Sequence, residues 1–153
     1  MLGKFAETFE GGCMSWQELS TISHYKTAVE IKSRLKIGEM KEALIGIEEL
    51  INALARSERR ALKSQLLRLM MHVIKWKSQP EKRSLSWIAS IKNAREEIKD
   101  IQEDTPSLTD EVIKNLWTKC FKSAQREANA EMNKKTKLTD LSWVEVFEDE
   151  YDF

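Results

Sequence analysis

The chain has 153 residues, a formal net charge of zero, and a composition of 41% hydrophobic and 33% charged residues. With only five glycines and two prolines, this composition argues against a disordered chain, and the length suits one globular domain with its own core. No stretch of about 18 uncharged apolar residues occurs, which excludes a typical membrane span, and the first residues lack a signal-peptide pattern, so we expect a cytoplasmic protein.

The N-terminal part of the sequence predicts a loose arm followed by one helix. Residues 1–14 show no periodic pattern and contain a pair of glycines, which predicts a flexible arm. Ser15 and Glu18 have the spacing of a capping box, in which two side chains satisfy the first amides of a helix. We therefore predict a helix that begins at Ser15, runs to about Leu35 and is ended by Gly38.

Two further segments, residues 39–55 and 57–77, carry apolar residues in helical steps of three and four. The first segment has a single stripe, which should pack against another element: Met40, Leu44, Ile47, Ile51 and Leu54. The second has a wider apolar face, typical of a central helix: Leu62, Leu66, Leu69, Val73 and Trp76. Ser57 has a side chain that can cap a separate helix, but no glycine or proline divides the segments. One fused helix and two helices therefore both remain open.

Proline residues mark the ends of the next helices. Gln79–Pro80 ends the central helix because proline has no amide hydrogen and disfavours helical backbone in the residue before it. Periodic apolar residues then predict a helix from about Ser84 to Ile101, antiparallel to the central one. After a break around Pro106, Thr109 is placed to cap a further helix. Its predicted buried seam comprises Ile113, Trp117, Cys120, Ala124 and Ala128.

The sequence closes with a short predicted helix and an acidic tail. Ser142 and Glu145 again have capping-box spacing, and the residues around them supply an apolar side that docks on the bundle: Trp143, Val146 and Phe147. No segment shows the alternation of a strand. We therefore predict an all-α fold in which residues 15–153 form a single-domain bundle of about five to six helices, mostly antiparallel.

Charge is unevenly distributed along the chain. Residues 56–95 carry eleven lysines and arginines against two acids, whereas residues 140–153 carry six acids and no base. Such asymmetry can indicate a nucleic-acid surface, or it can mean that the acidic tail lies on the basic face of its own domain. We favour the second interpretation, because a dedicated phosphate binder usually carries net positive charge over the whole domain.

Several short motifs, in order, resemble one known family. They are Arg56-Ser-Glu-Arg-Arg-Ala-Leu-Lys-Ser64, His72-Val-Ile-Lys-Trp-Lys-Ser-Gln-Pro80, Arg83-Ser-Leu-Ser-Trp87 and Asp104-Thr-Pro-Ser-Leu108. Over roughly residues 56–131 this pattern resembles the bacterial domain of unknown function family number twenty-nine, best represented in cyanobacteria. The resemblance implies an all-α fold and a bacterial cytoplasmic setting. It implies no established activity.

A polar strip borders the apolar face of the central helix. At 100° per residue, Gln65, Arg68, His72, Lys75 and Gln79 fall along one line, with Trp76 at its edge. Trp87 and Arg95 come from the neighbouring antiparallel helix and are expected to reach the same place. Our candidate binding residues are therefore Arg68, His72, Lys75, Trp76, Gln79, Trp87 and Arg95.

This strip admits a catalytic and a structural interpretation. In the first, His72 is a general acid or base and Lys75 and Arg95 hold a phosphate, as a metal-free ribonuclease needs. In the second, the same groups form a buried polar network that fixes the turn at Gln79–Pro80. We favour the structural interpretation, because a single histidine on a helix flank is more often structural than catalytic.

Two classes of function follow. No cluster of residues has metal-ligand spacing, Cys13 and Cys120 are lone thiols, and no cofactor-binding fingerprint occurs, so we expect no metal site and no cofactor. We favour a non-catalytic protein-interaction or adaptor module whose partner is another protein or a second copy of the chain. The alternative is a nucleic-acid-binding protein, or a metal-free ribonuclease of the toxin–antitoxin kind, that uses residues 56–95.

Overall fold

The computed structural model describes residues 14–153, which are mostly helical and contain no strand over that range. The all-α prediction is therefore confirmed. The arm predicted over residues 1–14 lies outside the described residues apart from Met14. Contacts divide the chain into two compact units, residues 1–57 (unit 1) and 58–153 (unit 2), and each is described by itself. That residues 15–153 form a single domain stays a prediction.

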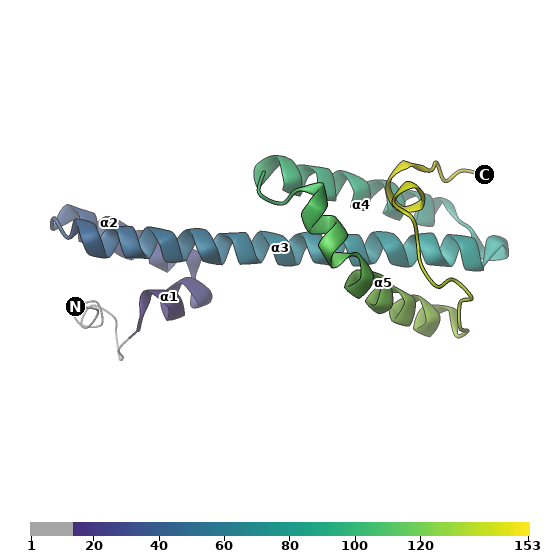
Figure 1. Cartoon of the computed structure of the whole chain (residues 1–153), viewed down its shortest axis with the longest axis horizontal. Coiled ribbons are helices and arrows are strands. Elements are labelled where there is room, and N and C mark those ends of the chain that lie inside the picture. The colour runs from purple at the N-terminus through teal and green to yellow at the C-terminus, as the bar shows by residue number, and fades with distance from the viewer. Residues whose placement is uncertain (1–13) are drawn as a thin grey trace. The chain divides into compact units, whose positions relative to one another are not determined.

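Unit 1 contains α1 (Trp16–Ile22), α2 (His24–Lys36) and the first part of α3 (Met40–Ser78) (Figure 1). Ser15 caps α1 as predicted, because its hydroxyl accepts from the Glu18 amide at 3.1 Å. The expectation of one continuous helix to Leu35 is wrong. The backbone of Ser23 is extended (φ −154°, ψ 114°), and its hydroxyl accepts from the Lys26 amide at 3.1 Å, which caps a new helix.

Small residues let the helices of unit 1 pack closely. The buried core comprises Trp16, Leu19, Ile31 and Ala43. Gly46 lies against this core, and a Cβ atom placed there would be 2.7 Å from the Trp16 ring and 2.8 Å from the Ile31 side chain. Gly38, with φ +83°, turns the chain from α2 into α3, as its predicted role at the helix end requires.

The two segments over residues 39–55 and 57–77 form one helix, α3, so Ser57 is internal and caps nothing. The face that α3 buries in unit 1 is made by Ala43, Gly46 and Ala53, rather than by the predicted apolar stripe. Of that stripe, Ile47 packs against the core, but the other four residues are 43–65% exposed: Met40, Leu44, Ile51 and Leu54. At Gly46 the Trp16 ring lies so close to the backbone that a larger side chain does not fit there.

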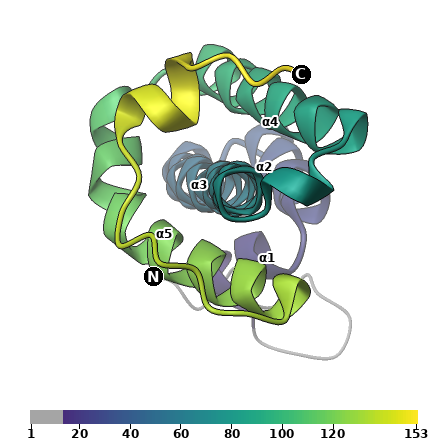
Figure 2. The same cartoon turned by 90° about the vertical axis from the view of Figure 1, so that its right-hand side faces the viewer.

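Unit 2 is a bundle around the C-terminal part of α3. After a short 3₁₀ helix (Pro80–Lys82), α4 (Leu85–Asp104) runs back antiparallel to α3, and α5 (Asp110–Met132) crosses the pair (Figure 1). Figure 2 shows α4, α5 and the C-terminal segment arranged around the end of α3. The core comprises residues from all of these elements, including Leu66, Leu69, Ile91, Ile113 and Val146.

Local signals place the ends of the unit 2 helices. Ser84 caps α4 by accepting from the Trp87 amide at 3.2 Å. Thr109 occupies the cap position of α5, although its side chain makes no capping hydrogen bond. The predicted C-terminal helix forms as a short π-helix, Val144–Glu148, and Ser142 and Glu145 exchange the two predicted capping hydrogen bonds at 2.9 and 3.1 Å.

Candidate functional site

His72, on α3, is buried and neutral. Its side chain Nδ1 lies 2.9 Å from the carbonyl oxygen of Arg68, one turn earlier. Because a carbonyl only accepts, Nδ1 carries the proton and Nε2 is left as an acceptor. Burial lowers the pKa of His72, and the hydrogen bond to the Arg68 carbonyl opposes this shift only in part. The neutral imidazole is the form that a general base requires, and it is also the form that a packed interior prefers.

Lys75 joins the three long helices of unit 2. Its Nζ lies 2.7 Å from a carboxylate oxygen of Glu131 on α5 and 4.8 Å from the centre of the Trp87 ring on α4. The Lys75 side chain is only 13% exposed. Its charge is therefore satisfied within the protein by an ion pair and a cation–π contact, which is the structural use of a lysine at this position.

Trp76 and Gln79 lie at the end of α3, where the chain turns. Trp76 is buried, and Arg83 donates from Nε to its carbonyl oxygen at 2.8 Å while the guanidinium lies 4.7 Å from the ring centre. The Trp76 ring also meets Tyr151 edge-on at 5.8 Å. Gln79 is buried at 5% exposure, and its backbone bonds Lys75 on one side and Lys82 on the other.

Arg95, on α4, is engaged by the C-terminal segment. Its Nε donates to the carbonyl oxygen of Val146 at 2.8 Å, and its guanidinium lies 5.5 Å from the centre of the Tyr151 ring. Burial lowers the pKa of Arg95, which the phenolic oxygen of Tyr151 and the carboxylate of Asp149 partly oppose. In the described part of the chain, no hydrogen bond or ion pair joins Arg95 to His72 or Lys75.

The predicted strip is therefore divided between two sets of contacts. His72 and Lys75 lie towards α5, where Glu131 binds Lys75, whereas Arg95 lies towards the C-terminal segment. Arg68 is exposed and contributes its carbonyl oxygen. The catalytic assignment of His72, Lys75 and Arg95 stays a prediction, and the contacts found at each residue are those of the structural interpretation.

A pocket of about 330 Å³ lies between α4 and the C-terminal segment. Its cationic lining is Lys92 and Arg95, and its anionic lining is Glu148, Glu150 and Asp152. The tail therefore places three carboxylates in the same pocket as the two cations of α4. A small anionic ligand would have to compete with these carboxylates.

The acidic tail lies on the basic residues of its own unit, as we favoured. Lys77 forms an ion pair with Glu145, and this contact lowers the pKa of the Glu145 carboxyl group. Apolar packing accompanies the charges: the Trp117 ring stacks on Trp143 at 5.7 Å and its Nε1 donates to the carbonyl of Leu141 at 2.9 Å. The tail is therefore fixed by both ionic and aromatic contacts.

A small group of cations on unit 2 stays without carboxylate partners in the described residues. Lys63 on α3 and Lys119 on α5 lie close enough that the Lys119 ammonium lowers the pKa of Lys63. Arg59 adds a further positive charge beside them. Arg59 and Lys63 belong to the basic segment and Lys119 adjoins them from α5, so this group offers positive charge to an outside anion.

Other chemistry finds little support in residues 14–153. No group of three or more His, Cys, Asp or Glu side chains there is placed to hold a metal ion. Cys120 is buried and forms no disulfide. Burial raises the pKa of its thiol, which disfavours the reactive thiolate. Cys13 lies outside the described residues. No helix in this range is long and apolar enough to span a bilayer.

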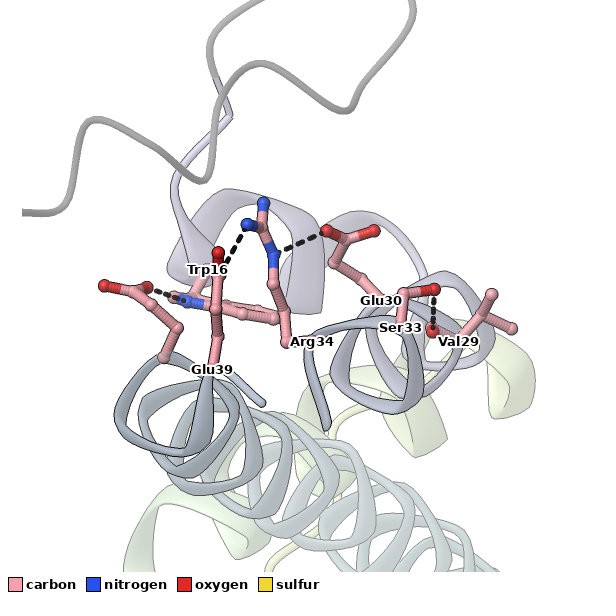
Figure 3. Close-up of polar contacts among 7 residues, drawn as sticks. Trp16, Val29, Glu30, Ser33, Arg34 and Glu39 are labelled. Atoms are coloured by element: carbon pink, nitrogen blue, oxygen red, sulfur yellow. Dashed lines mark hydrogen bonds and ion pairs between the residues drawn. The ribbon is translucent and has the colours of Figure 1, made fainter. Parts of the chain in front are cut away.

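A buried ionic cluster in unit 1 was not predicted from the sequence. Arg34 lies between Glu30, at 3.0 Å, and Glu39, at 2.8 Å (Figure 3). Burial acts to lower the pKa of Arg34, but the two carboxylates outweigh it and raise that pKa. Beside this cluster the Trp16 indole donates to Glu42 at 3.2 Å. Glu30 and Arg34 are four apart on the buried face of α2, a spacing that could have indicated the pair.

Most of the exposed large apolar side chains in the described part of the chain belong to unit 1. Of the thirteen large hydrophobic residues exposed in the described chain, ten lie in this unit and are 37–79% exposed: Ile22, Tyr25, Val29, Leu35, Ile37, Met40, Leu44, Ile45, Ile51 and Leu54. We call these ten residues the unit 1 apolar surface. Sequence periodicity did not predict this exposed surface, because a regular apolar stripe has the same pattern whether or not another element covers it.

Comparison with known proteins identifies the family. Residues 26–151, well over half of the chain, match the family model described as Domain of unknown function DUF29. No curated protein and no solved structure matches the chain.

Proposed function

The chain belongs to the DUF29 family, and we propose that it is a non-catalytic protein-interaction module that binds its partner through the unit 1 apolar surface. The observation that carries this proposal is the concentration of ten exposed large hydrophobic side chains between Ile22 and Leu54. Scattered apolar residues are normal on a protein surface, but a concentration in one small unit is typical of a binding surface.

The contrast between the two units supports this proposal. Unit 2 leaves three large hydrophobic residues exposed, Leu85, Val144 and Phe153, although it is the larger unit. Burying one large apolar side chain contributes about 1.5–3 kcal/mol. A partner that covered even three or four residues of the unit 1 apolar surface would gain several kcal/mol, which is enough to offset a large part of the entropy lost on association.

The internal use of the polar strip supports a non-catalytic role. Lys75 is held by Glu131, and Arg95 by the Val146 carbonyl. Arg83, which is not part of the strip, is held beside it by the Trp76 carbonyl. A phosphate-binding or catalytic pocket needs such groups to point at a substrate. In this chain Lys75 and Arg83 fix junctions between elements, and Arg95 holds the tail through its Nε while also lining the pocket beside the tail.

The proposal is tested by site-specific photo-crosslinking in the cells that produce the protein. A photoreactive phenylalanine analogue replaces Val29 or Leu44, and the matched control replaces Leu85, which is 74% exposed but lies in unit 2. We expect protein adducts at positions 29 and 44 and none at position 85. Adducts at none of the unit 1 positions would overturn the proposal.

A nucleic-acid function is distinguished by salt dependence. Phosphate contacts make affinity fall steeply with added salt, whereas a largely apolar interface responds weakly. We expect the purified chain to show no salt-sensitive binding to labelled RNA or DNA in fluorescence anisotropy, and no cleavage of the label. Salt-sensitive binding that weakens when Arg59, Lys63 and Lys119 are replaced together by alanine would instead favour the nucleic-acid alternative.

A further inference from the structure

The apolar stripe of α3, in which Ile47 is half-buried against the core of unit 1 and the other four residues are exposed, has the repeat of a coiled coil. Met40, Leu44, Ile47, Ile51 and Leu54 follow one another in alternating steps of four and three. This spacing averages 3.5 residues, the period at which two helices supercoil with their apolar seams in continuous contact. In heptad terms Leu44 and Ile51 occupy a positions, and Met40, Ile47 and Leu54 occupy d positions. The partner that fits such a seam is therefore another helix with the same repeat.

We propose that the helix covering this stripe is α3 of a second copy of the chain, antiparallel to the first. This inference rests on the proposed function and names the occupant of one part of its surface. The layers that result pair Met40 with Ile51 and Leu44 with Ile47, each twice because of the two-fold axis. All four residues lie on a helix that unit 1 already holds in place, so little ordering is needed on association.

Charged residues beside the stripe are complementary in this arrangement. Lys41 and Glu48 occupy e positions, are exposed, and make no salt bridge within the described chain. They cannot bond each other in one helix, because seven residues separate them by about 10 Å along the axis. In the antiparallel pair the e positions of the two helices face each other, so Lys41 of each copy meets Glu48 of the other.

The same charges select the register and the orientation. A shift by one heptad brings Glu48 against Glu48, or Lys41 against Lys41, and like charges at these positions are destabilising. In a parallel pair the e positions face g positions instead, and the g positions here are Ala43 and Leu50, which carry no charge. Those two residues also pack within unit 1 already, Ala43 being fully buried. Only the antiparallel arrangement gives both charges an opposite partner.

The interface is short, and its strength should be modest. The stripe covers about four turns of α3, with four exposed apolar residues from each copy. Contacts of this size are at the lower end of specific interfaces, for which micromolar dissociation constants are common. We therefore expect a monomer–dimer equilibrium that sedimentation can measure over micromolar concentrations, starting from a chain mass of 17.8 kDa.

Charge reversal in the full-length chain provides the test, measured by sedimentation equilibrium at low salt. Lys41→Glu and Glu48→Lys should each weaken the dimer about tenfold, because both symmetric pairs become repulsive. The double variant K41E/E48K reverses both signs and should return the dissociation constant to within about twofold of the original. Ile51→Glu should weaken the dimer at least a hundredfold by placing a charge in the seam, at roughly 1.4 kcal/mol for each tenfold.

Matched controls separate dimer loss from misfolding. Leu85→Glu introduces the same charge at an exposed residue of α4 and should leave the dissociation constant unchanged. All variants should keep the helical circular dichroism of the original chain, because each changed residue is exposed. A chain that stays monomeric at high micromolar concentration, a dimer insensitive to Ile51→Glu, or a double charge reversal that fails to restore association would each overturn the inference.

Failure of this inference can be told apart from failure of the proposed function. If crosslinks from position 44 join the chain to a different protein while sedimentation shows only monomers, the interaction module stands and the second copy is wrong. If sedimentation shows no dimer and position 44 forms no adduct, the stripe is not a binding surface at all.

Discussion

The C-terminal tail should be held chiefly by apolar packing, with its ion pair a minor contribution. Val146 is fully buried in the core of unit 2, and Val146→Ala removes the volume of about two methylene groups. At about 0.8 kcal/mol for each group, with a further cost for the cavity, this change should lower the free energy of unfolding by about 2 kcal/mol. The loss should be independent of salt, because no charge is involved.

Glu145→Gln isolates the ionic contribution. The change removes the charge that binds Lys77 but keeps an oxygen that can accept from the Ser142 amide. Because the side chains of Lys77 and Glu145 are 33% and 25% exposed, the pair should contribute less than about 1 kcal/mol, and less still in 1 M salt, where the screening length is about 3 Å.

The assay is urea denaturation at low salt and in 1 M sodium chloride, since guanidinium would itself screen the ion pair. We expect the cost of Val146→Ala to exceed that of Glu145→Gln at both salt concentrations. A Glu145→Gln variant that loses more stability than Val146→Ala at low salt, and recovers it at high salt, would refute this explanation of tail docking.

Three further changes probe the two units by urea denaturation. His72→Gln should flatten the fall in the free energy of unfolding between pH 7 and 5. The pKa of His72 is lowered in the folded chain, so below the usual histidine pKa of about 6.5 the unfolded chain binds more protons than the folded one. An unchanged pH profile would argue against the buried neutral state. Gly46→Ala should destabilise the chain by up to about 2 kcal/mol, because overpacking against Trp16 costs about 1–3 kcal/mol and the gain in helix propensity is about 1 kcal/mol. A more stable variant would contradict the packing described. Arg34→Met should cost about 3 kcal/mol by removing the cation that Glu30 and Glu39 share, whereas a loss below about 1 kcal/mol would show that the cluster is not structural.

Features set by neighbouring residues could be predicted from the sequence. The cap at Ser15 and the exchange between Ser142 and Glu145 each depend on residues three apart, and both occur. The start of a helix at about Ser84 was predicted from apolar periodicity, and the structure adds a cap by the Ser84 hydroxyl. The break at Ser23 was missed although it also involves a local serine cap, because the apolar periodicity on both sides suggested one uninterrupted helix.

Features set by distant residues could not be predicted. The ion pair of Lys75 with Glu131 joins positions 56 residues apart, and the contact of Arg95 with Val146 spans 51 residues. Periodicity identifies which side of a helix is apolar but not which neighbour covers it. The stripe beginning at Met40 illustrates this limit, because small residues on the adjacent face took its place in the core of unit 1.

The proposed role of the unit 1 apolar surface predicts that it is accessible in the isolated chain and covered in the cell. Met40 is 65% exposed on this surface, whereas Met70 is fully buried in unit 2 and serves as an internal control. Peroxide oxidation followed by peptide mass spectrometry reports the accessibility of both side chains under each condition.

In the dilute purified chain we expect Met40 to oxidise much faster than Met70, and in intact cells we expect the oxidation of Met40 to fall towards that of Met70. Equal oxidation of Met40 in cells and in the dilute chain would contradict the assignment of this surface to a protein partner.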